Sequence, residues 1–141
     1  MAFRFPLVSL LRLWRSQQRQ QELTLQRISN KVNRLRSDLS GVQKEISRIS
    51  AEPPHGRSAG EIQFDSQLLH ALNSRCIEIQ ESLRSALAER ELAVAEFRRI
   101  WQRRETLETL QRKSQAAFML DQARSAQREL DDWFLDRKLR N

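Results

Sequence analysis

The sequence predicts an all-α protein, a long two-helix antiparallel coiled-coil hairpin with a C-terminal helical overhang. Apolar residues recur at alternating steps of four and three along most of the chain, which is the heptad pattern of a coiled coil. Two of the three prolines and two of the three glycines lie within residues 51–60, so one turn is expected there. The scarcity of both residue types argues against β sandwiches and barrels, which need a turn about every 8–12 residues.

The first helix is expected over about residues 5–51. Eleven of thirteen seam positions are apolar, and the seam continues over about six heptads. The two polar positions, Gln18 and Gln21, either set the register of pairing or mark a loosened seam. Gly41 lies off the seam and weakens the helix without ending it. The seam positions are Leu7, Leu11, Trp14, Gln18, Gln21, Leu25, Ile28, Val32, Leu35, Leu39, Val42, Ile46 and Ile49.

A loop is expected over about residues 52–60 and a second helix over about 61–137. Pro53 removes a backbone donor and disfavours helix at Glu52. The second seam drifts after Leu83 onto a neighbouring track, as a straight helix does against a 3.5-residue repeat. Its positions are Ile62, Asp65, Leu69, Leu72, Cys76, Ile79, Leu83, Ala86, Arg90, Ala93, Phe97 and Ile100, and the neighbouring track holds Leu87, Val94 and Trp101.

Charge supports antiparallel pairing within a single coiled-coil domain, residues 1–141. The net charge of the chain is +7. Residues 1–50 carry a net charge of +7, residues 51–97 of −4 and residues 98–141 of +4. A short loop makes the helices antiparallel neighbours, which places the basic first helix beside the acidic block. Reflection about residue 56 puts Leu7 opposite about residue 105 and leaves an overhang of about 30 residues.

The same features argue against an enzyme, a cofactor and a metal site. A two-helix layer encloses no pocket for a small-molecule substrate. The sequence has no phosphate-binding glycine loop and no nucleophile elbow. Cys76 is the single cysteine and lies on the seam, and His55 and His70 lack the spacing of metal ligands. Glu105 and Glu108 are interpreted as part of a solvated helix face.

Targeting and nucleic-acid binding are weaker interpretations. No apolar segment is long enough to span a membrane, and no cleavage site for a secretory signal follows the apolar start. A mitochondrial presequence stays open, because the arginines of residues 4–19 precede the first acid, Glu22. The arginines of residues 98–104 surround Trp101 but are too diffuse to predict specific nucleic-acid binding. A basic binder of nucleic acid or membrane surface would show steep salt dependence.

Large apolar side chains and arginines gather where the two ends of the chain are expected to meet. Aromatic residues and arginine are the usual anchors of protein interfaces, so this open end predicts a protein partner. Homodimerisation through the overhang is the alternative. A second stripe of Phe64, Leu68, Ala71 and Arg75 either thickens the helix pairing or forms an outward docking patch. The open-end residues include Phe3, Phe5, Leu10, Leu13, Trp14, Phe118, Met119, Leu120, Trp133, Phe134 and Leu135.

The two ends of the sequence also resemble the flagellar export protein FliJ family. The stretches at 3–13 and 17–23 resemble its opening, and those at 103–108 and 127–137 its close, while the middle agrees only in its heptads. Related stalk proteins of virulence type III secretion share the shape and parts of the ending. The four stretches read FRFPLVSLLRL, QQRQQEL, RRETLE and QRELDDWFLDR.

The resemblance implies a non-enzymatic stalk of the flagellar type III export apparatus. Its implied partners are the hexameric export ATPase, an export-gate membrane protein and, for some members, export chaperones. Its implied location is the cytoplasm, peripherally at the inner-membrane export apparatus. The alternatives are a virulence type III stalk protein and a plain structural homodimeric coiled coil.

Carried onto this chain, the resemblance implies an ATPase-binding end and, by position alone, a gate-docking stripe. Trp14 departs from the family pattern, where a charged or small polar residue is expected. The ATPase-binding residues are Leu7, Leu11, Trp14, Arg15, Leu130, Trp133, Phe134 and Arg137, and the gate-docking residues are Phe64, Leu68, Ala71 and Arg75.

Overall fold

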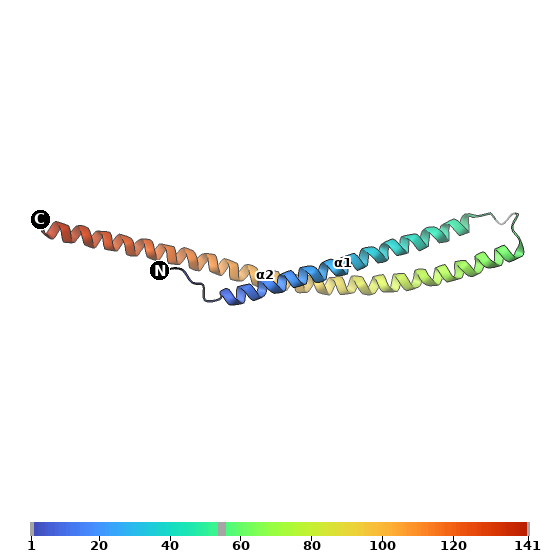
Figure 1. Ribbon diagram of the computed structural model, residues 1–141, viewed down its shortest axis with the longest axis horizontal. Helices are drawn as coiled ribbons and strands as arrows, with labels where there is room; N and C mark the ends of the chain where they lie inside the picture. Colours follow the sequence, from blue (N-terminus) through green and yellow to red (C-terminus); the bar gives the residue numbers. More distant parts are fainter. Residues whose placement is uncertain (1, 54–55, 141) are drawn as a thin grey trace. The chain divides into compact units, whose positions relative to one another are not determined.

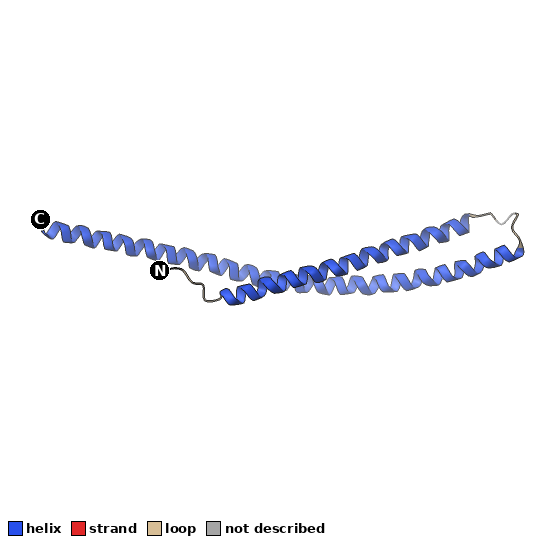
Figure 2. Ribbon diagram, in the orientation of Figure 1, coloured by secondary structure: helices blue, strands red, loops and turns tan. Residues whose placement is uncertain are grey.

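Two α-helices account for most of the chain. The computed structural model describes residues 2–53 and 56–140, and within them lie α1 (Val8–Ala51) and α2 (Ala59–Arg140) (Figure 1). Figure 2 shows helix and connecting segments, with no strand in this described part. The helices run antiparallel, since Gln21 of α1 contacts Ala93 and Lys31 contacts Glu89. The expected all-α class and the antiparallel coiled-coil hairpin are confirmed.

The start of α1 is set by a turn at Pro6 and Leu7. The backbone N–H of Val8 donates to the carbonyl of Phe5 over 3.2 Å, and that of Leu11 donates to Leu7 over 3.0 Å. Helix therefore begins at Val8, whereas the heptad pattern alone pointed to about residue 5. At its other end α1 stops at Ala51, two residues before Pro53, because a residue that precedes proline disfavours the helical conformation.

An N-cap at Ser58 sets the start of α2. The Ser58 hydroxyl accepts a hydrogen bond from the backbone N–H of Glu61 over 3.2 Å, which satisfies a donor that helix geometry leaves free. Helix therefore begins at Ala59, before the first seam residue, and continues to Arg140. Gly56 precedes the cap with a φ of 82°, a conformation that residues with a Cβ rarely adopt. His55 lies outside the described residues.

Contacts group the chain into two compact units. Unit 1 comprises Met1–Arg19 with Arg98–Asn141, and unit 2 comprises Gln20–Phe97. Each unit contains part of α1 and part of α2. The single coiled-coil domain expected from the sequence stays a prediction.

The core of unit 2 is the heptad seam. Six buried side chains fill it, and all are seam positions that the sequence pattern identified. Ile62 and Arg90 are exceptions, because the stepping placed both on the seam while their side chains are exposed. A guanidinium remains in water unless it is paired, and Leu87 and Val94 of the neighbouring track are half-buried on either side of it. The buried residues are Ile28, Val32, Ile49, Ile79, Ala86 and Ala93.

The core of unit 1 joins the start of the chain to α2. Phe5 and Leu11 are buried there together with Ile100 and Leu107. The ring of Phe3 lies 5.5 Å from that of Phe118, centroid to centroid. Residues 119–140 of α2 are exposed throughout, so the overhang begins at residue 119 and is shorter than the reflection suggested. No helix in the described part of the chain is long and apolar enough to cross a membrane.

Candidate protein-binding site

The first turns of α1 pack onto α2 within unit 1. Leu11 is fully buried, with an exposed fraction of 0%, and it forms the centre of this contact. Leu7 lies one turn earlier and remains partly exposed, while Trp14 is half-buried. Of the expected ATPase-binding residues near the start of the chain, Leu11 is therefore part of the core, whereas Leu7 and Arg15 are exposed and Trp14 is half-buried.

Glu108 joins two arginines beside this contact. Its Oε1 accepts hydrogen bonds from Nε and Nη2 of Arg15, over 3.2 and 3.1 Å. Its Oε2 accepts a hydrogen bond from Nη1 of Arg104 over 2.8 Å, and Nη2 of Arg104 donates to Glu105 over 3.3 Å. Both carboxylate oxygens of Glu108 are thus engaged by charged donors, which make stronger hydrogen bonds than neutral ones. This network ties α1 to α2 and fixes the direction of Arg15.

The ionisation of Glu108 reflects its partners. Partial burial raises the pKa of Glu108, but hydrogen bonds from Arg104 and Arg15, with the positive charges of both, outweigh it. The pKa of Glu108 therefore lies below its ordinary value, and the carboxylate stays charged near neutral pH.

Trp14 forms one wall of an open groove in unit 1. The guanidinium of Arg103 lies over its ring, 4.8 Å from the centroid, in a cation–π contact. The groove has a volume of about 440 Å³ and combines apolar walls with two arginines. Its residues are Leu10, Trp14, Arg99, Gln102, Arg103, Thr106 and Leu107.

A second group of expected residues lies on the overhang. Trp133 and Phe134 have exposed fractions of 53% and 60%, and their rings meet edge to face at 5.1 Å. The guanidinium of Arg137 lies 5.3 Å from the centroid of Trp133. Leu130 is exposed one turn earlier. The chain therefore presents an aromatic, cationic surface that no other described residue covers.

The expected open-end site is divided into two patches. Trp14 and Arg15 of α1 lie against Arg103 and Glu108 of α2. Leu130 follows Glu108 by 22 residues of continuous helix, which is about 33 Å at 1.5 Å per residue. A partner that touches both patches must extend along α2.

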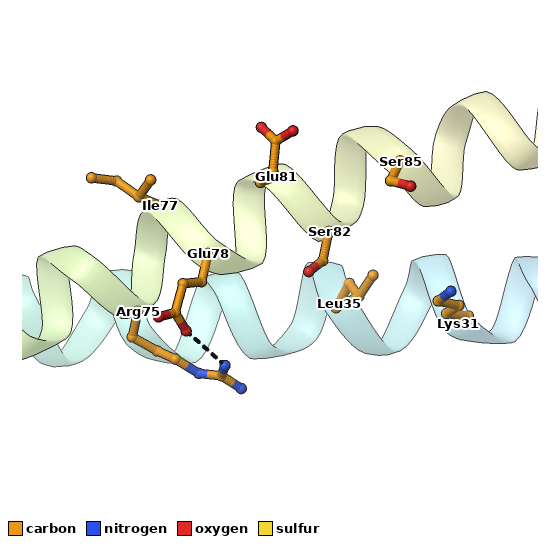
Figure 3. Close-up of a pocket in the computed structure, with 8 residues that line it drawn as sticks. All are labelled: Lys31, Leu35, Arg75, Ile77, Glu78, Glu81, Ser82 and Ser85. Atoms are coloured by element: carbon orange, nitrogen blue, oxygen red, sulfur yellow. Dashed lines mark hydrogen bonds and ion pairs between the residues drawn. The ribbon is translucent and has the colours of Figure 1, made fainter.

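The expected gate-docking residues lie in unit 2. Phe64 has an exposed fraction of 65%, Ala71 and Arg75 are exposed, and Leu68 is half-buried. Nη1 of Arg75 donates to Oε2 of Glu78 over 3.4 Å at one end of an open groove between the helices (Figure 3). Most of this stripe therefore faces outward instead of thickening the helix contact.

Sequence reasoning missed the role of Glu108. It treated this carboxylate as part of a solvated face and the arginines at 103 and 104 as a basic run. The available signal was the seam itself, because its four–three steps continue beyond Ile100 and include Arg104, the partner of Glu108 on α2. The continued seam positions are residues 104, 107, 111, 114 and 118, all buried or half-buried. In the described residues no group of three or more His, Cys, Asp or Glu side chains could hold a metal ion.

The fold and these surfaces define an antiparallel two-helix coiled coil with exposed aromatic and arginine patches, a class suited to binding other proteins. The family model described as "Flagellar FliJ protein" matches residues 3–141. The chain therefore belongs to the FliJ family, whose members are components of flagellar protein export. Comparisons with curated proteins and with solved structures gave no match.

Proposed function

We propose that this chain is the non-enzymatic stalk of the hexameric flagellar export ATPase. It inserts the patches of unit 1 into the ATPase ring, promotes ring assembly and ATP hydrolysis, and links the ATPase to the export gate. Membership of the FliJ family and the two-helix fold support this proposal. The protein would act in the cytoplasm, peripherally at the inner-membrane export apparatus.

The observation that carries the proposal is the exposed pair Trp133 and Phe134 with Arg137 over the indole ring. Exposure of two large aromatic side chains to water is unfavourable compared with their burial, and such exposed clusters usually mark an interface. An aromatic ring beside a guanidinium is the combination that dominates the binding energy of many protein interfaces.

The mechanism follows from a mismatch of symmetry. A single two-helix coiled coil inside a six-fold ring contacts the six subunits unequally. A binding partner shifts an equilibrium between two conformations only by the difference in its affinity for them. Unequal contacts with the stalk would therefore bias the ATPase subunits toward different nucleotide states. Rotation or exchange of these contacts would then couple the subunits in sequence.

The double substitution Trp133→Ala and Phe134→Ala tests the binding patch. Both side chains are exposed, so the variant should remain as helical as the parent by circular dichroism. We expect it to lose at least about tenfold in affinity for the ATPase, which corresponds to about 1.4 kcal/mol.

Leu92→Ala is the matched control, because Leu92 is 75% exposed but lies in unit 2. It should stimulate ATP hydrolysis as the parent does. Full stimulation of ATP hydrolysis by the Trp133 and Phe134 variant, at the concentration that suffices for the parent, would contradict a role of this patch in ATPase binding.

The outward stripe of unit 2 is proposed to dock on the export gate. Phe64→Ala with Arg75→Ala removes its exposed aromatic ring and its charge. We expect this variant to bind the soluble domain of the gate protein less tightly while it stimulates the ATPase normally. Unchanged gate binding would place the docking surface elsewhere. An escort role for export chaperones belongs to the same proposal and needs its own binding assay.

A further inference from the structure

The C-terminal part of α2, residues 112–137, carries an apolar stripe of its own. Its residues recur at steps of three and four and are exposed along their whole length. Only alanines and large apolar side chains occupy the central positions of the stripe between residues 116 and 134, apart from Gln127. The stripe comprises Ala116, Met119, Leu120, Ala123, Ala126, Leu130, Trp133 and Phe134.

Several residues of this stripe lie on the side of α2 opposite the buried Leu107. Ala116 follows the buried Leu107 by nine residues, which at 100° per residue places it about half a turn around the helix. Met119, Ala123 and Leu130 fall on the same side by the same count. Phe118, which contacts Phe3 ahead of α1, is the last residue of α2 that is not exposed, and the apolar residues beyond it lie on a different face of the helix.

The two halves of residues 112–137 carry opposite net charges. Residues 112–124 hold three bases and one acid, a net charge of +2. Residues 125–137 hold two bases and four acids, a net charge of −2. A parallel neighbour of the same sequence would place like charges together, whereas an antiparallel one places each half against its opposite.

We propose that the free protein pairs with a second copy of itself through this stripe, antiparallel and centred between Arg124 and Ser125. In that register Met119 meets Leu130 of the second copy, and Ala123 meets its Ala126. Trp133 meets the small Ala116 of the second copy, so a large side chain packs against a small one. The contact repeats itself about a two-fold axis, which is the usual symmetry of a homodimer.

The apolar contacts of the pair, within residues 116–133, extend over about 27 Å of helix, a contact of modest size. In the same register the charged residues of 112–137 face one another on both sides of these contacts. Pairing would cover Trp133, which the proposed function assigns to the ATPase. On that assumption the dimer is a resting form that must separate before the stalk enters the ring. The dimer itself does not depend on that assumption, because it is measured without the ATPase.

Sedimentation velocity of the full chain, over a wide range of concentration, tests the pairing. We expect the protein to shift from monomer to dimer as its concentration rises. Asp131→Lys with Asp132→Lys changes the net charge of residues 125–137 from −2 to +2, so both halves repel and dimerisation should weaken at least about tenfold. Arg112 and Lys113 lie in residues 112–124, so reversing their charges can restore the complementarity that the first variant loses.

Adding Arg112→Glu and Lys113→Glu to that variant makes the halves complementary again and should restore the dimer. These four side chains are exposed, so circular dichroism should show unchanged helix in both variants. A protein that stays monomeric throughout would overturn the proposal. So would a dimer that survives the first pair of substitutions, because that dimer would use another surface or a parallel register.

Discussion

Glu108 shows how one side chain can hold the start of the chain in place. It accepts hydrogen bonds from Arg15 on α1 and Arg104 on α2, and its side chain is 23% exposed. Exposed ion pairs contribute little because water screens them, but a carboxylate with charged donors on both oxygens is more strongly held. Arg15 and Trp14 are consequently presented in a defined direction, with Arg103 over the indole ring.

Glu108→Gln should lower the free energy of unfolding by about 0.5–1 kcal/mol at neutral pH. Since the pKa of Glu108 is lowered in the folded state, its ionisation contributes to the free energy of unfolding at pH values above the ordinary carboxyl pKa. That contribution is lost as the pH falls from there through the lowered folded value. The parent should therefore lose more stability than the variant on acidification, which urea unfolding at several pH values would measure.

Glu81→Gln is the control for this measurement, because Glu81 pairs only locally with Arg84 along α2 in the contacts described. It should change stability little. Identical pH profiles for the parent and Glu108→Gln would contradict a stabilising role for the network.

At the scale of the helices, short-range signals decide where each element begins and ends. Pro53 follows α1, Ser58 caps α2, and Gly56 supplies the positive φ between them. Arg57 pairs with Glu52 before it and Asp65 after it, which links the end of one helix to the start of the other. These contacts involve few residues, so single substitutions can test them.

Ser58→Ala should destabilise the folded state by about 1 kcal/mol, because the N–H of Glu61 loses its capping acceptor. Thermal unfolding followed by circular dichroism measures the change. Ser66→Ala within α2 is the control, and it should be neutral or slightly stabilising because Ala is the better helix former. Equal stability of Ser58→Ala and the parent would mean that the cap contributes nothing.

Heptad spacing was sufficient to predict two antiparallel helices and most buried positions, since spacing determines which residues share a helix face. It could not determine which residues meet across the two helices. For that reason the pairing of Arg15 with Glu108 was missed, and the overhang was placed too early. Arg90 was wrongly placed on the seam because spacing alone ignores the cost of burying a charge.

Across the whole molecule, charge and apolar surface are distributed unevenly between the two units. Basic α1 lies beside the acidic part of α2 in unit 2, where Lys31 pairs with Glu89 at 3.7 Å. In unit 1, several aromatic side chains and most of the arginines are exposed at the surface. We propose that unit 1 serves the ATPase and unit 2 the gate, so that one chain connects two partners.

The most direct test of the stalk proposal is ATP hydrolysis by the cognate export ATPase, titrated with this protein at fixed ATPase concentration. We expect stimulation that saturates near one copy of this chain per ATPase hexamer. Circular dichroism should confirm that the added protein is helical. Absence of stimulation by helical protein, or saturation near one copy per ATPase subunit, would contradict a single asymmetric stalk.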